Sequence, residues 1–305
     1  MNTSAGQPAQ ALVHVNGQLL PRAEATISVF DRGFLFADSV YEVIPVYQGA
    51  AFRLRQHLAR LDRSLGELAI PNPHSNDEWS ELIRELAEAN GGGDLSIYLQ
   101  VTRGAPEWRE HWRDAPTQCT VVAFTGGLHP QPASLAEHGV RTILRNDPRW
   151  RRCDIKATAL LPNVLARREA AAADAFEAIF VRDGYVTEGA AANVFIVSDG
   201  LVSTPPLDNT LLPGVTRDAV LDFLRQTGRE CIQRPVSRET LLEADEVWLT
   251  SSTREILPVT WIDDHPVGAG RPGPVWADAQ PGFSNWVREQ TGWLPLTDPA
   301  QMDRP

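Results

Sequence analysis

The chain has 305 residues, 43% of them hydrophobic, which is enough apolar material to fill the cores of two domains. Its formal net charge of -11 at pH 7 disfavours nucleic acid and anionic membrane surfaces as partners, because both favour a positive field. With three separated cysteines, no signal peptide and no apolar run of about 20 residues, the sequence predicts a protein of the reduced cytoplasm without membrane contact.

The first part of the chain is expected to form two hairpins, two helices and two strands, in that order. Asn-Gly at 16–17 and Gln-Gly at 48–49 are turn signals between strand-like segments. From Leu54 to Leu68, leucines recur at helical steps, and a glycine run after Asn90 ends the second helix. The expected ranges are 11–54 for the hairpins, 54–68 and 76–90 for the helices, and 95–102 and 118–125 for the strands.

The second part is expected to form further hairpins, separated by Asp-Gly turns, and helices that come in blocks. Thr216 is predicted to be the N-cap of one of these helices, which Gly228 ends. The expected ranges are strand 140–145, helix 163–174, hairpins within 177–205, helix 217–227 and strand 246–251. Residues after Gly273 give no assignable pattern.

Strands in hairpins with helices in blocks favour an α+β (mixed α/β) fold over repeated βα units, which also argues against a TIM-barrel aldolase. A stretch rich in Gly, Pro and Ser marks the expected linker. The predicted regions are a flexible N-terminal tail at 1–11, a small N-terminal α/β domain at 12–126, an interdomain linker at 127–139, a large mixed, β-barrel-like domain at 140–276 and a C-terminal extension at 277–305.

Lys156 is the only lysine in the chain, and the other 27 residues of the Lys+Arg count are arginine. A lysine amine can lose its proton and attack a carbonyl, whereas arginine stays charged, so this lysine is a candidate Schiff-base nucleophile. Arg149, Arg151 and Arg152 precede it, and positive neighbours favour the neutral amine. The alternative is a solvated lysine in a chain that otherwise prefers arginine.

Three other features suit a phosphorylated, aromatic ligand. Glu188 is a single carboxylate before small residues, Gly214 to Thr216 precede a helix start that favours an anion, and four hydroxyl residues run from Thr250 to Thr253. Each feature alone is also compatible with an ordinary strand end, capped helix or turn. Together with the lysine they fit pyridoxal 5'-phosphate (PLP), which has an aldehyde, a pyridine nitrogen and a phosphate. The seven histidines form no metal-binding spacing, and no metal site is expected.

With these segments in view, the chain resembles the fold type IV PLP enzymes, and within them the D-amino-acid transaminases, from about Leu12 to Gly273. RCDIK around Lys156 and VTEG around Glu188 are the most diagnostic motifs. The other matching stretches are DRGFLFADSVYEVIPVYQG (31–49), QHLARL (56–61), YLQVTRG (98–104), LLPGVTR (211–217) and WLTSSTREILPV (248–259). The resemblance implies a PLP-dependent homodimer.

The resemblance also implies roles for the site residues. Lys156 would form the Schiff base with the cofactor and move the proton during catalysis, and Glu188 would face the pyridine nitrogen. The implied phosphate ligands are Arg60, Val215, Thr216, Ser251 and Ser252, with Leu212 supporting the ring and Arg149 beside the O3' oxygen. Tyr41, Arg109 and His111 would bind the α-carboxylate of the substrate.

Some residues depart from the family pattern. Ala190 to Ala192 replace residues that often carry hydroxyl groups, and the loop from Arg103 to His111 is one residue longer, which leaves the position of Arg109 at the carboxylate site open. We predict a D-amino-acid transaminase that acts on substrates such as D-alanine, D-glutamate and 2-oxoglutarate. The alternatives are a branched-chain L-amino-acid transaminase, an (R)-selective amine transaminase, an aminodeoxychorismate lyase, or a PLP- or sugar-phosphate-binding module without turnover.

Overall fold

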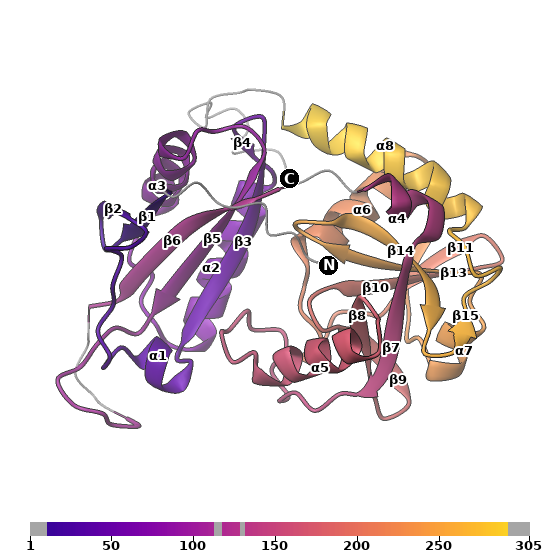
Figure 1. The fold of residues 1–305 in the computed structure, drawn as a ribbon, viewed down its shortest axis with the longest axis horizontal. Coiled ribbons are helices and arrows are strands. Elements are labelled where there is room, and N and C mark those ends of the chain that lie inside the picture. The colour runs from indigo at the N-terminus through magenta and orange to yellow at the C-terminus, as the bar shows by residue number, and fades with distance from the viewer. Residues whose placement is uncertain (1–10, 113–117, 129–131, 292–305) are drawn as a thin grey trace. The chain divides into compact units, whose positions relative to one another are not determined.

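The computed structural model describes residues 11–112, 118–128 and 132–291 (Figure 1). The chain forms two compact units. The first comprises Met1–His129, Ile155–Ala159 and Arg288–Pro305, and the second comprises Pro130–Asp154 and Leu160–Val287. The tail predicted at 1–11 lies, except for Ala11, outside the described residues.

The first unit is a six-stranded antiparallel sheet with the order β2-β1-β6-β5-β3-β4. Its strands are β1 (Leu12–Val15), β2 (Gln18–Pro21), β3 (Ser39–Tyr47), β4 (Ala50–Ala51), β5 (Leu95–Thr102) and β6 (Thr120–Gly127), and its helices are α1 (Arg32–Phe36), α2 (Leu54–Glu67) and α3 (Asn76–Ala89). Leu58, Leu61 and Leu65 of α2 pack with residues of the strands and of α3 in one apolar core. Ser75 and Glu78 form a capping box that begins α3.

Residues Ile155–Ala159 join the first unit although they lie beyond the expected domain boundary. The Tyr41 amide donates to the Lys156 carbonyl at 3.0 Å, and the Thr158 amide donates to the Ser39 carbonyl at 3.1 Å. Ile155 and Ala157 are buried in the core of this unit. The segment that carries the lysine is therefore held along β3 by backbone hydrogen bonds and by apolar burial.

The second unit is built on a nine-stranded mixed sheet that curls as a half-barrel, and β15 extends it beside β14. The order is β12-β11-β10-β13-β14-β7-β8-β9, with parallel pairs β11–β12, β14–β7 and β7–β8. Its strands are β7 (Val140–Asn146), β8 (Glu177–Arg182), β9 (Tyr185–Gly189), β10 (Asn193–Ser198), β11 (Leu201–Thr204), β12 (Cys231–Gln233), β13 (Glu246–Ser251), β14 (Glu255–Ile262) and β15 (His265–Pro266). Its helices are α4 (Ala133–His138), α5 (Leu161–Ala172), α6 (Val215–Gln226), α7 (Arg238–Leu242) and α8 (Pro274–Gln290). The mixed α/β fold class is as predicted.

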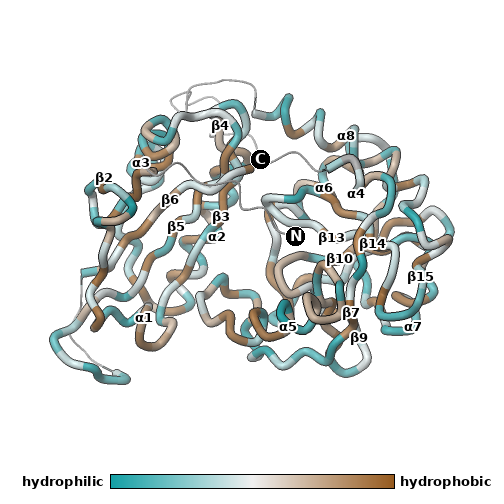
Figure 2. The backbone as a smooth tube through the Cα atoms, in the orientation of Figure 1, coloured by the Kyte–Doolittle hydropathy of each residue, from teal (hydrophilic) through white to brown (hydrophobic). Residues whose placement is uncertain are grey.

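Hydrophobic residues recur along the strands of both units (Figure 2), and apolar side chains of the second unit are buried in clusters. Among the described residues, no helix is long and apolar enough to cross a membrane.

Three details differ from the sequence expectations or go beyond them. The stretch predicted as a linker contains α4, and the unassigned region after Gly273 contains α8. Thr216 is not the N-cap of α6, because the helix begins two residues earlier with Gly214 as its N-cap and Thr216 lies in the first turn.

Candidate active site

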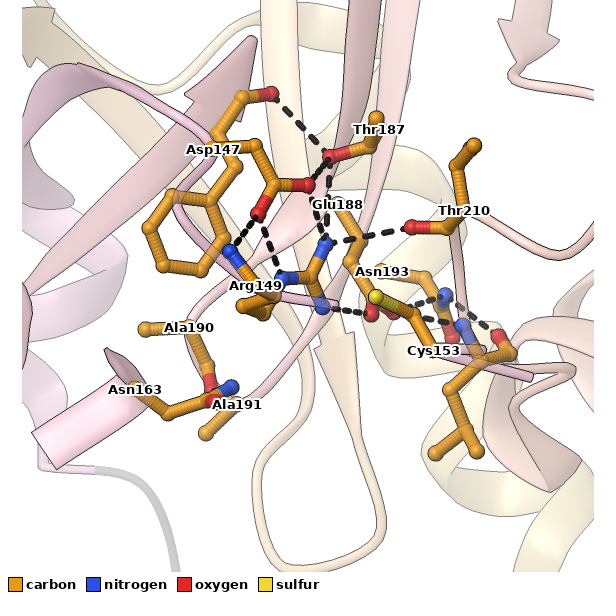
Figure 3. A network of polar contacts seen from close by, with 12 residues as sticks. Asp147, Arg149, Cys153, Asn163, Thr187, Glu188, Ala190, Ala191, Asn193 and Thr210 are labelled. Atoms are coloured by element: carbon orange, nitrogen blue, oxygen red, sulfur yellow. Dashed lines mark hydrogen bonds and ion pairs between the residues drawn. The ribbon is translucent and has the colours of Figure 1, made fainter. Parts of the chain in front are cut away.

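Glu188 lies at the end of β9 with its side chain buried and both carboxylate oxygens occupied (Figure 3). Oε1 forms a short ion pair with Nη1 of Arg149. Oε2 accepts from Nδ2 of Asn193 at 3.2 Å and from the Leu212 amide at 3.0 Å. These partners compensate a negative charge on the carboxylate and fix its position.

Arg149 is itself fixed by Asp147, whose side chain has no exposed surface. Nε and Nη2 of Arg149 donate to the two oxygens of Asp147 at 2.9 and 2.8 Å, in a bidentate pair. Burial would raise the pKa of Asp147, but the hydrogen bonds and charge of Arg149 hold it below its ordinary value. Thr187 also donates to Asp147, at 3.1 Å. The result is a continuous chain of buried charges from Asp147 through Arg149 to Glu188.

Asn193 connects Glu188 to the beginning of α6. Its Nδ2 also donates to the Leu212 carbonyl at 2.9 Å, and its Oδ1 occupies the space where a Cβ on Gly214 would lie. Gly214 provides no side-chain cap, so it leaves amide groups of the first turn, where Val215 and Thr216 lie, without a capping side chain. A helix start of this kind suits a phosphate.

The turn of Ala190, Ala191 and Ala192 is held by partners other than the hydroxyl groups that it lacks. The Ala191 amide donates to Oε1 of Glu177 at 2.6 Å, and Nδ2 of Asn163 donates to the Ala190 carbonyl at 2.7 Å. Burial raises the pKa of Glu177, although the Ala191 hydrogen bond opposes this shift. A side chain from β8 and one from α5 thus support the turn directly after Glu188.

Ser251 ends β13, and Ser252 begins the turn that leads to β14. Both are half-buried. The hydroxyl group of the neighbouring Thr250 is buried without a hydrogen-bond partner. Hydroxyl groups therefore gather at this hairpin end, as the sequence indicated.

Lys156 of the first unit is half-buried, and its Nζ lies 4.2 Å from the ring centroid of Tyr41. Its backbone amide donates to Oγ of Ser64 at 3.3 Å. Tyr41 stacks on Tyr98, with ring centroids 5.5 Å apart. The amine thus extends from an anchored backbone over an aromatic ring, an arrangement that restricts its orientation.

Arg60 was predicted to bind a phosphate, and in this structure its guanidinium binds Glu42. Nε and Nη2 of Arg60 donate to the two oxygens of Glu42 at 2.8 and 2.7 Å. Nδ1 of His57 lies 2.7 Å from the same carboxylate. Burial opposes ionisation of Glu42, but Arg60 and His57 hold the pKa of Glu42 well below its ordinary range. The pKa of His57 is also lowered, and burial is the main cause.

Arg109 and His111 lie on an exposed loop and converge on one aromatic ring. The guanidinium of Arg109 lies 4.7 Å from the Phe36 ring centroid, and the rings of His111 and Phe36 are 5.3 Å apart. Nη2 of Arg32 donates to the His111 carbonyl at 3.0 Å. The structure thus brings Arg109 and His111 together, while Tyr41 contacts Tyr98 and Lys156 instead.

Sequence reasoning missed several of these residues, namely Asp147, Asn193, Glu177, Glu42, His57, Arg32 and Phe36. Asp147 could have been found from the Asp-x-Arg spacing, because a carboxylate two residues before Arg149 is within reach of it. Most of the others act through contacts between different elements of the fold, which the local sequence does not reveal.

A family model for class IV amino-transferases matches residues 39–262. The chain belongs to this family. A D-alanine aminotransferase of Bacillus licheniformis is 40% identical over 277 residues, which cover 90% of this chain and 97% of that protein. A D-alanine aminotransferase of Listeria monocytogenes is 37% identical, with coverage of 92% and 98%.

Among solved structures, the Escherichia coli branched-chain amino acid aminotransferase has a TM-score of 0.86 and 28% identity, covering 93% of this chain and 96% of that one. The branched-chain amino acid aminotransferase of T.th., complexed with N-(5'-phosphopyridoxyl)-L-glutamate, has a TM-score of 0.83 and 30% identity, with coverage of 94% and 96%. The resemblance found in the sequence is confirmed: the protein is a fold type IV aminotransferase, and its cofactor is PLP.

The described residues fit this cofactor. A buried, charge-compensated carboxylate suits a pyridinium nitrogen, and a helix start without a capping side chain suits a phosphate. Lys156 carries the only side-chain amine of the chain.

Proposed function

We propose that this aminotransferase is a D-amino-acid transaminase, which moves the amino group of D-alanine or D-glutamate to 2-oxo acids such as 2-oxoglutarate. The observation that carries the chemistry is the Glu188 carboxylate, buried and held by Arg149, Asn193 and the Leu212 amide. The similarity to D-alanine aminotransferases over nearly their full length supports the class of substrate.

Lys156 is the catalytic residue of this proposal. When bound, PLP supplies an electron sink for the negative charge that develops at the substrate Cα. The Lys156 amine would hold the cofactor through its aldehyde group, and the same amine would move the proton that leaves the substrate Cα. Glu188 holds a proton on the pyridine nitrogen, which keeps the ring electron-poor.

The remaining residues of the site bind the cofactor and orient its ring. Amides and hydroxyl groups of Val215, Thr216, Ser251 and Ser252 bind the phosphate, and Leu212 supports the ring. Arg60 contributes positive charge to the phosphate while Glu42 holds its guanidinium. Arg149 orients Glu188, and its predicted place beside the O3' oxygen remains a prediction.

Tyr41, Arg109 and His111 are proposed to bind the substrate α-carboxylate. The contact of Arg109 and His111 with Phe36 supports a shared position for these two side chains. The solved relatives named branched-chain aminotransferases make an L-selective enzyme the second candidate.

We also propose that the protein is a cytoplasmic homodimer. Large apolar side chains are exposed on the first unit, including Val29 at 67%, Phe34 at 68% and Trp108 at 67%. A contiguous patch of exposed apolar side chains is typical of a protein contact surface, and that these side chains form one is part of the proposal. The cysteines Cys119, Cys153 and Cys231 are free in this structure.

The test of the function is the visible absorption spectrum of the protein with added PLP, followed during separate titrations with D-alanine and L-alanine. We expect a cofactor band that D-alanine removes and L-alanine leaves intact. A band removed only by L-alanine would contradict the substrate class, and a protein that forms no band would contradict the function as a whole.

Two variants complete this test. Lys156→Ala is expected to form no lysine-bound cofactor band and to lose at least about a hundredfold in turnover, because the proton carrier is absent. Arg168→Ala removes an exposed arginine side chain of α5 and is expected to behave as wild type.

A further inference from the structure

The turn between β13 and β14 has an unusual backbone. Ser251 pairs with Glu255 across the hairpin, and Ser252, Thr253 and Arg254 form the connection. Glu255 has a φ of 52°, in the left-handed region. Hairpins with three-residue connections commonly need one left-handed residue, and glycine is the usual choice because a Cβ disfavours this conformation. A glutamate at this position needs support from its surroundings.

That support comes from α8. Oε2 of Glu255 accepts from Nε2 of Gln280 at 3.0 Å and from Oγ of Ser284 in a short hydrogen bond. Nε2 of Gln280 also lies 3.0 Å from Oγ of Ser284, so the three side chains form a closed set. We call these three residues the Glu255 clamp. The clamp fixes a left-handed residue directly opposite Ser251.

The helix that provides the clamp is firmly docked on the same hairpin. The amides of Val275 and Trp276 donate to the two oxygens of Glu246 at 2.7 and 2.9 Å. Nε1 of Trp276 donates to the Ile256 carbonyl at 3.2 Å. Gly273 lies so close to Glu246 that a Cβ there would overlap its carboxyl group. Glu246 at the start of β13 and Glu255 at the start of β14 therefore hold α8 at two places.

We propose that α8 is a positioning element, which holds the turn of Ser251 and Ser252 in the conformation that binds the cofactor phosphate. This inference rests on the proposed function, in which the two serines bind that phosphate. The residues of the Glu255 clamp are positioning residues, because they act through the turn.

The test is the double variant Gln280→Ala/Ser284→Ala, which removes both donors to Glu255. We expect its dissociation constant for PLP to rise about tenfold, the scale of one hydrogen bond to a charged group. We also expect a displaced ³¹P resonance of the bound phosphate and, at saturating PLP, a turnover number within about twofold of wild type. The matched control is Asp278→Ala, which removes an exposed ion pair of the same helix with Arg229 and should change neither property.

A second pair of variants distinguishes the loss of the Glu255 side-chain hydrogen bonds from the strain of a left-handed residue. Glu255→Ala keeps the Cβ without the anchor and should weaken PLP binding, whereas Glu255→Gly should retain more affinity because glycine accepts a left-handed φ. Wild-type affinity and an unchanged ³¹P resonance in both the double variant and Glu255→Ala would overturn the inference. Failure of the wild-type protein to bind PLP would instead contradict the proposed function. If the double variant does not fold, Ser284→Ala alone is measured by the same two criteria.

Discussion

Glu42 has no exposed surface and accepts hydrogen bonds from both Arg60 and His57. Loss of one member of a buried ion pair leaves the other charge without compensation, and this cost exceeds the value of the pair itself. The pKa of His57 is lowered, first by burial, so the positive charge that Glu42 compensates is that of Arg60.

We expect Glu42→Gln to lower the free energy of unfolding at neutral pH by about 3–5 kcal/mol. The pKa of Glu42 is lowered in the folded protein from 4.5, so its contribution is complete above that value and is lost as the pH falls below it. Urea unfolding at several pH values measures this. In the wild type, protonation of Glu42 causes part of the loss of stability at low pH. Glu42→Gln should lack this part.

The control is Glu81→Gln, which removes the exposed ion pair with Arg84 on α3 and should leave stability unchanged. Equal stability of Glu42→Gln and wild type across the pH range would mean that the buried pair is not needed.

At the residue scale, chemistry and composition were sufficient to single out Lys156 and Glu188 as candidates, and their roles stay predictions. A lone lysine and a carboxylate before small residues are visible without knowing the fold. The role of Asn193 was not predictable. This residue acts through contacts with Glu188, Leu212 and Gly214, which depend on how β10 and the start of α6 pack together.

At the scale of elements, the beginning of α6 shows how tertiary contacts decide a helix boundary. Thr216 is a favourable N-cap residue in isolation. The helix begins two residues earlier, with Gly214 as its N-cap, and Oδ1 of Asn193 takes the space that a Cβ at this N-cap would occupy.

Gly214→Ala should therefore disturb the phosphate side of the site. The new Cβ would overlap Oδ1 of Asn193, so the helix start or the Asn193 side chain must move. We expect PLP affinity to fall about tenfold or more, as measured by fluorescence titration of the cofactor-free protein. Gly66→Ala is the matched control, since a Cβ at this position of α2 meets open space. It should stabilise the protein by about 0.5–1 kcal/mol through helix propensity and leave PLP binding unchanged.

Helices with regular leucine spacing and hairpins with Asn-Gly or Asp-Gly turns were predictable, because local sequence decides them. The helix α8 was not, since Pro281 and Gly282 inside it are turn signals. Burial of Trp276, Phe283 and Val287 overrides these signals.

At the scale of the whole molecule, the division into units could not be found from composition. The Gly- and Pro-rich stretch after β6 was visible, but the return of Ile155–Ala159 to the first unit was not. That return depends on long-range pairing with β3, for which the local sequence carries no signal.

The proposed homodimer can be tested with Phe34→Glu, which places a charge in the exposed apolar region of the first unit. Burying an unpaired charge in an interface is costly, so we expect dissociation into monomers at micromolar concentration, seen by sedimentation velocity. Leu207→Glu, at an apolar residue of the second unit that is 51% exposed, is the control and should remain dimeric. A wild-type protein that sediments as a monomer would contradict the proposal.

The lone lysine has a consequence for how this protein can be followed in a mixture. Because Lys156 carries the only side-chain amine, reagents that modify amines have one internal target, and the Tyr41 ring covers one side of it. Borohydride would reduce the bond between the Lys156 amine and the cofactor and make it permanent. The fraction of molecules with the corresponding mass increase would then equal the fraction whose lysine had bound the cofactor. The occupancy of the proposed catalytic residue can thus be read by intact-mass spectrometry, without a substrate and without a label.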